Sequence, residues 1–266
     1  MKWLLATMFL VCATAHDAPA ATPVYDDYRA VLMAFVDESG LVDYAALKDQ
    51  RGYLDDFVRY LASVTPAECN AWSADNRMAF WINAYNALTL RAIIDHYPIG
   101  PAEPNRSYPL NSIRQIPGVF DRMRVQVAGE EITLAYIETK HLREDFREPR
   151  IHVALVCAAM SCPTLRREPY EGAKLAKQLD DQARDFLSRP RNFAIDRDRG
   201  VVRVSEIFRW YQDDFLPAAR PQYELPAKTA LRAFTSPYLS RADRDFVQTA
   251  RIEYIPYDWA LNEQPR

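Results

Sequence analysis

The sequence predicts an α+β fold, with a central, mainly antiparallel sheet packed against several helices. Segments with helical apolar spacing lie before and after a group of short, β-type runs, and the two kinds do not alternate regularly. Regular alternation would be typical of a doubly wound parallel sheet, which is therefore not expected. A chain of 266 residues with 49% hydrophobic content can bury a full core. We therefore expect one globular domain over residues 21–266.

The first 20 residues predict a signal peptide. Lys2 precedes an apolar run over residues 3–11, and small residues with A-x-A spacing follow it. Cleavage is expected after Ala20, with Ala15 as the alternative. The apolar run is shorter than the ~20 residues that span a bilayer, so no transmembrane helix is expected in the mature chain. The expected location is periplasmic or secreted.

Three amphipathic segments open the mature chain. Residues 24–37 and 47–64 carry apolar side chains at helical spacing, which predicts a helix over each. Ser73 can cap a longer helix that runs to about His96. This third helix is expected to be the spine of the core.

The rest of the chain predicts short strands followed by further helices. The sheet is expected to contain residues 150–156 and to pack on helix 73–96. Strands are predicted over residues 124–127, 131–133, 150–156, 193–195, 201–204 and 251–255, and helices over residues 133–142, 171–188, 205–211 and 224–234.

Two cysteines lie in the most informative segment, residues 152–163. The apolar run 153–156 is typical of a strand buried on both faces, and the small, proline-ended stretch after it is typical of a turn. Cys157 is thus expected to end a strand at the rim of the sheet. A half-desolvated thiol there is a candidate nucleophile.

Cysteine pairing is left open by the sequence. Loss of Cys12 with the signal peptide leaves Cys69, Cys157 and Cys162, an odd number, so at least one thiol is free in a monomer. A disulfide between Cys157 and Cys162 would need a tight turn that brings their Cα atoms within ~7 Å.

The sequence also does not decide which residue would act as the base that deprotonates Cys157. On a straight strand His152 faces away from Cys157 and lies about 16 Å from it, so a direct pair needs a bulge or an early strand end. His96 or His141 could supply an imidazole from a helix.

Three segments together resemble the DUF547 family, which is named for having no known function. They are the thiol segment, Phe80-Trp81-Ile82-Asn83-Ala84-Tyr85-Asn86-Ala87-Leu88-Thr89-Leu90, and Tyr257-Asp258-Trp259-Ala260-Leu261-Asn262. The resemblance extends from about residue 25 to residue 262. Where the family often has a histidine after an Ile-Glu pair, this chain has Thr139, with His141 two residues later.

Polar side chains within these apolar stretches are the candidate site residues, because an unpartnered buried polar group costs ~1 to 3 kcal/mol. Glu138 can act as an acid or pair with an arginine. The candidates for catalysis are Cys157, His152, Asn83 and Asp258, and those for binding are Cys162, Asn86, Glu138 and Trp81.

The amides and the late aspartate each allow two interpretations. Asn83 and Asn86 share one helix face, so either can donate to an oxyanion, orient a base, or simply tie the helix to neighbouring backbone. Asp258 can orient a base or accept backbone N–H groups.

Charge and motifs exclude several classes of function. The net charge of −3 and the lack of a basic, aromatic-rich cluster argue against nucleic-acid binding. No HExxH or paired CxxC motif occurs, and glycine is scarce, so neither a metal nor any other cofactor is expected.

Two functions remain, and the sequence does not decide whether the protein is an enzyme. One is a thiol-dependent acyl-transfer or amide-hydrolysing enzyme that uses Cys157, distantly like papain or transglutaminase folds. The other is a non-catalytic periplasmic binding module with a Cys157–Cys162 disulfide and an aromatic groove. Its partner would be a small molecule, a peptide or a protein.

Overall fold

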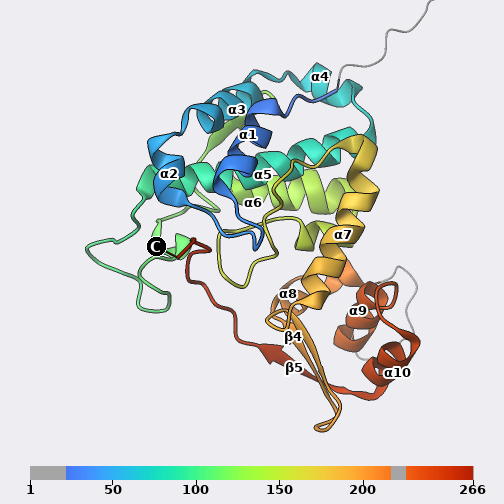
Figure 1. Ribbon diagram of the computed structural model, residues 1–266. Helices are drawn as coiled ribbons and strands as arrows, with labels where there is room; N and C mark the ends of the chain where they lie inside the picture. Colours follow the sequence, from blue (N-terminus) through green and yellow to red (C-terminus); the bar gives the residue numbers. More distant parts are fainter. Residues whose placement is uncertain (1–21, 217–225, 266) are drawn as a thin grey trace, which may run out of the picture.

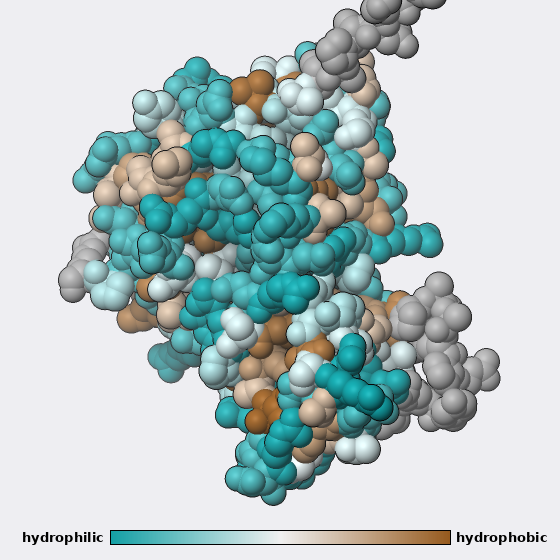
Figure 2. Space-filling model, turned by 45° about the vertical axis from the view of Figure 1, so that its right-hand side comes forward, coloured by the Kyte–Doolittle hydropathy of each residue, from teal (hydrophilic) through white to brown (hydrophobic). Residues whose placement is uncertain are grey.

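The computed structural model describes residues 22–216 and 226–265 (Figure 1). The predicted signal peptide, residues 1–20, lies outside these ranges. Within them, no helix combines the length and apolar character needed to cross a membrane. Figure 2 shows that hydrophilic residues cover most of one face of the molecule, with apolar residues in small groups.

Five helices form the upper part of the molecule in Figure 1. They are α1 (Asp26–Phe35), α2 (Tyr44–Asp49), α3 (Gly52–Ser63), α4 (Pro66–Ala71) and α5 (Ala74–His96). The predicted spine is confirmed in α5, where the Ser73 side chain accepts a hydrogen bond from the N–H of Asn76. Every residue from Met78 to Leu90 is buried, so α5 is enclosed on all sides by the core.

Among the described residues, the strands form two small sheets and no single central sheet. β1 (Val125–Val127) and β2 (Glu130–Ile132) make an antiparallel hairpin. The second sheet has the order β3–β4–β5, from strands at Phe193–Asp196, Val201–Ser205 and Arg251–Ile255. Its first pair is antiparallel and its second pair is parallel. The α+β class is therefore confirmed, whereas the single central sheet is wrong.

Residues 150–156 do not form the predicted strand. Pro149–Val153 is a short 3-10 helix, η3, which Glu148 caps by accepting the N–H of Arg150. The backbone beyond it pairs with a side chain: the Asn86 amide bonds the carbonyl of Ala154 and the N–H of Val156. Residues 154–156 are buried in the cluster around α5, Val153 is buried in a second cluster, and none of them lies within a sheet. A short apolar run in a sequence does not distinguish these kinds of burial.

The remaining helices surround these elements. The predicted helix 133–142 appears as a short α-helix continued by a π-helix, and helix 224–234 is described from Pro226 onward. Helix α10 was not predicted. The bounds are η1 (Ile113–Gln115), α6 (Leu134–Tyr136), η2 (Ile137–Glu144), η4 (Gly172–Lys174), α7 (Leu175–Ser188), α8 (Ile207–Trp210), η5 (Gln212–Phe215), α9 (Pro226–Thr235) and α10 (Arg241–Thr249).

Two apolar clusters make up the core, and η3 lies where they meet. Ile151 and Ala154 belong to the cluster around α5. Val153, between them, belongs to the cluster of α7, α8, α9 and the three-stranded sheet. The segment that leads to Cys157 thus runs along a boundary between two packed regions, where cavities commonly occur.

Candidate functional site

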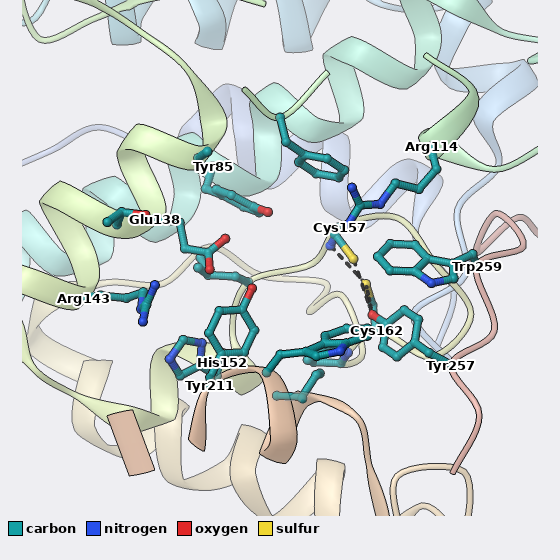
Figure 3. Close-up of a pocket in the computed structure, with 17 residues that line it drawn as sticks. Tyr85, Arg114, Glu138, Arg143, His152, Cys157, Cys162, Tyr211, Tyr257 and Trp259 are labelled. Carbon is teal, nitrogen blue, oxygen red and sulfur yellow. Dashed lines mark hydrogen bonds between the residues drawn. The ribbon is translucent and has the colours of Figure 1, made fainter. Parts of the chain in front are cut away.

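A cavity of about 340 Å³ opens beside the two neighbouring cysteines (Figure 3). We call it the thiol cavity. Its walls come from both apolar clusters: α5, η2 and η3 on one side, and α8 with the segment after β5 on the other. The labelled lining residues are Tyr85, Arg114, Glu138, Arg143, His152, Cys157, Cys162, Tyr211, Tyr257 and Trp259.

A tight turn brings Cys162 back to Cys157. Ala158 is buried and has a φ of 61°, a left-handed conformation that is unusual for a residue with a Cβ. The C-terminal segment clamps the turn, because the N–H of Met160 bonds the carbonyl of Ala260 over 2.8 Å. The turn therefore depends on chain from two distant parts of the sequence.

Donors converge on the sulfur of Cys162. Its Sγ accepts the backbone N–H of Cys157 at 3.1 Å and that of Ala159 at 3.4 Å. The Tyr257 hydroxyl lies 3.2 Å from the same sulfur and 3.4 Å from the Sγ of Cys157. Cys162 is buried, Cys157 is half-buried, and the described cysteines are all free thiols.

These contacts shift the pKa values of the two thiols in opposite directions. Burial raises the pKa of Cys162, but hydrogen bonds from Cys157, Tyr257 and the two N–H groups outweigh it and lower that pKa. The pKa of Cys157 is raised well above its usual value, first by its hydrogen bond to Cys162 and then by burial. The pair thus titrates as a unit and holds its first negative charge on Cys162.

His152 lines the same cavity and is paired with a carboxylate. Its Nε2 lies 2.7 Å from the Oδ2 of Asp214, and its ring stacks on Tyr211 with centroids 4.0 Å apart. Arg143 also binds Asp214, with an Nη2 to Oδ1 distance of 3.2 Å. In the described part of the chain, His152 makes no hydrogen bond to either cysteine.

Asp214 was not among the predicted site residues. Burial raises its pKa, but the hydrogen bonds and positive charges of His152 and Arg143 lower it further, to about 2. It is a permanent anion beside the imidazole at ordinary pH.

Glu138 faces the cavity from η2. Its charge and its hydrogen bond, after burial, raise the pKa of Tyr211. Burial likewise raises the pKa of Tyr85 well above its usual value, with a smaller effect from Glu138. Both hydroxyls are therefore protonated donors at neutral pH.

The structure brings half of the predicted site residues to the thiol cavity. Asn83 instead bonds both the N–H and the carbonyl of Tyr170, at 2.9 and 2.8 Å. Trp81 stacks on His141 with centroids 3.9 Å apart. Those that line the cavity are Cys157, Cys162, His152 and Glu138, and those that do not are Asn83, Asn86, Asp258 and Trp81.

Asp258 is exposed, and its carboxylate binds the backbone two residues further along the chain. Its carboxylate accepts the N–H of Ala260 at 2.9 Å, and its own N–H bonds the hydroxyl of Ser161. The neighbouring Tyr257 is the residue that reaches the thiols. The predicted site residue of this motif is thus the charged one, whereas the aromatic one lines the cavity.

The thiol cavity offers no ready metal site. Over residues 22–216 and 226–265, no group of three or more His, Cys, Asp or Glu side chains is arranged to hold a metal ion. What the cavity does offer is a pair of thiols with unequal acidity, neutral tyrosine hydroxyls and a His–Asp pair.

A scan of family models matches residues 69–187 to DUF547, described as a protein family of unknown function. A search of curated proteins and a search of solved structures gave no significant match. The matched segment includes both thiols, His152 and Glu138, whereas Asp214 and Tyr257 lie beyond it. This match makes residues 69–187 similar to the DUF547 family.

Proposed function

We propose that the protein is a thiol-dependent acyl-transfer enzyme that acts on an amide, ester or thioester through Cys157. The observation that carries this proposal is the convergence of two backbone N–H groups and a tyrosine hydroxyl on Cys162, directly beside the more open Cys157. A thiolate stabilised in this way can accept a proton from the neighbouring thiol.

The two cysteines would act as nucleophile and proton acceptor. The Cys157 sulfur attacks the carbonyl carbon while its proton moves to the Cys162 thiolate, and the carbonyl π electrons move to oxygen. When the oxyanion collapses, the bond to the leaving group breaks and that group takes the proton back from Cys162. A thioester on Cys157 remains, and water or another acceptor resolves it.

Other cavity residues have roles that follow from their protonation. Tyr85 faces the cavity in Figure 3, and burial keeps its hydroxyl protonated, so it is the candidate donor to the oxyanion. Asp214 accepts from Nε2 of His152, so Nδ1 is the ring nitrogen that would take a proton from water. His152 is thus the candidate base for the water that resolves the thioester.

A p-nitrophenyl acetate assay on the purified protein tests the proposal. We expect a burst of p-nitrophenol equal to the enzyme concentration, and an acetyl group on Cys157 by peptide mass mapping. Cys157→Ser should abolish both. Cys69→Ser is the matched control, because Cys69 is buried in α4 and does not line the cavity. Acetylation of Cys69 or of surface lysines without a burst would contradict the proposal.

The contact between the two thiols favours a second candidate. In an oxidising compartment Cys157 and Cys162 could close into a disulfide, leaving a binding module for a small molecule, peptide or protein. Export itself is proposed from Lys2, the apolar run 3–11 and the A-x-A spacing. Mass analysis of protein taken directly from the periplasm distinguishes the two, since a disulfide lacks two hydrogens and blocks acetylation.

A further inference from the structure

Arg114 is a cation of the thiol cavity that has no carboxylate partner among the residues that the structure describes. The cavity is lined by two arginines, and Arg143 is committed to Asp214. Across the described ranges, Arg114 makes no ion pair, and its side chain contacts aromatic rings instead. Such a charge beside a reactive group is available to a ligand.

Three rings hold the guanidinium of Arg114 in place. Its Cζ lies 4.5 Å from the centroid of Trp259, 5.1 Å from that of Phe120 and 5.7 Å from that of Tyr108. Cation–π contacts do not use the N–H groups along the edge of the guanidinium as hydrogen-bond donors, so these groups stay available to a ligand. The edge presents the paired donors that match a carboxylate.

Charge is distributed unevenly along the cavity. Figure 3 shows Arg114 beside Trp259 and the thiols, with Glu138 and Arg143 on the opposite side. Because Arg143 is neutralised by Asp214, Glu138 gives that side a negative character. An anionic ligand group is therefore attracted to the Arg114 side and repelled by the other.

We propose that Arg114 is a specificity-determining residue that binds a carboxylate of the substrate close to the carbonyl which Cys157 attacks. The substrate class is then an acyl compound with a free carboxylate near its reacting carbon. This inference rests on the proposed function, since it takes Cys157 as the nucleophile.

A pair of alkylating reagents tests this inference independently of the unknown substrate. Iodoacetate carries a carboxylate next to its reacting carbon, whereas iodoacetamide is its neutral analogue. In each case the Cys157 sulfur displaces iodide, and the thiol proton passes to the buffer. The measurement is the ratio of the iodoacetate rate to the iodoacetamide rate at Cys157, followed by peptide mass mapping.

We expect Arg114→Gln to lower this ratio about fivefold, the effect of one ion pair at an exposed site. The iodoacetamide rate should stay unchanged, which also shows that the thiols remain in place. Arg106→Gln is the matched control, since Arg106 lies in an exposed stretch outside the cavity. It should keep the original ratio. If Arg114→Gln does not fold, Arg114→Met, which keeps apolar contact with the rings, should give the same fall.

The outcomes separate the two proposals. If Cys157 reacts with both reagents but the ratio is the same in wild type, Arg114→Gln and Arg114→Met, the role of Arg114 is wrong. An equal fall in Arg106→Gln would also overturn it, because the cause would then be the general charge of the protein. If neither reagent modifies Cys157 in the reduced protein, the proposed function itself fails.

Discussion

The side chain of Asn86 forms the hydrogen bonds with the backbone at Val156 that a neighbouring strand would form in a sheet. Its side-chain oxygen accepts the N–H of Val156 at 2.9 Å, and its amide nitrogen donates to the carbonyl of Ala154 at 3.0 Å. Both groups are buried, so without Asn86 they would lack partners. This single side chain on α5 therefore fixes where the chain emerges at Cys157.

We expect Asn86→Leu to lower the free energy of unfolding by about 2 to 4 kcal/mol, because two buried backbone groups lose their hydrogen bonds. The rate of Cys157 alkylation should change as well. Asn83→Leu is the matched control: it removes the same kind of paired contact, but at Tyr170. It should destabilise comparably and leave alkylation unchanged. Urea unfolding and iodoacetamide kinetics measure the two effects, and equal alkylation in both variants would contradict this role.

The long helix α5 could be predicted because its signals are local. A capping residue, Ser73, and a sustained apolar pattern predict this helix, and both features are found in α5. The apolar run at residues 153–156 carries no such signal, since burial against α5 and burial in a sheet demand the same residue types. What decided the outcome was Asn86, whose partner lies 70 residues away.

The site could be predicted only in part, for a similar reason. The thiols and His152 were found because their residue types carry chemistry. Tyr257 and Asp214 were missed, because their importance comes from contacts across 95 and 62 residues of sequence. The residue type predicts the chemistry of which a side chain is capable. Contacts between distant segments of the chain decide which groups lie beside it.

Serine substitutions of the two cysteines should have different effects. Cys157→Ser should abolish acyl transfer while leaving the free energy of unfolding within about 1 kcal/mol of wild type. Cys162→Ser should slow acyl transfer, because the proton acceptor is gone. It should also shift Cys157 alkylation to lower pH, because the hydrogen bond and charge of Cys162, which raise the pKa of Cys157, are lost. A structural disulfide would instead cost about 2 to 4 kcal/mol in either variant, with the double variant no worse. Denaturant unfolding of the periplasmic protein, with and without reductant, distinguishes these results.

Tyr257→Phe tests the stabilisation of the thiolate. The hydroxyl lies 3.2 Å from the Sγ of Cys162, and its hydrogen bond lowers the pKa of that thiol. Its loss makes the charged form less favourable, so the pH profile of thiol alkylation should move to higher pH. Tyr254→Phe, on β5 and outside the cavity, is the control and should leave the profile unchanged. An unchanged profile in Tyr257→Phe would show that the hydroxyl does not bind the thiolate.

Asp214 should make the stability of the protein depend on acid pH. Its pKa is lowered to about 2 by His152 and Arg143, against the effect of burial, and lies below its usual value. A group whose pKa is lowered by folding stabilises the folded state above its unfolded pKa and loses that contribution as the pH falls. We therefore expect up to about 2 kcal/mol to be lost between about pH 4 and pH 2. Asp214→Asn should be less stable at neutral pH and lack this part of the acid loss, whereas Asp258→Asn, at an exposed carboxylate, should keep it. Urea unfolding at a series of pH values measures the difference, and parallel curves for wild type and Asp214→Asn would contradict the assignment.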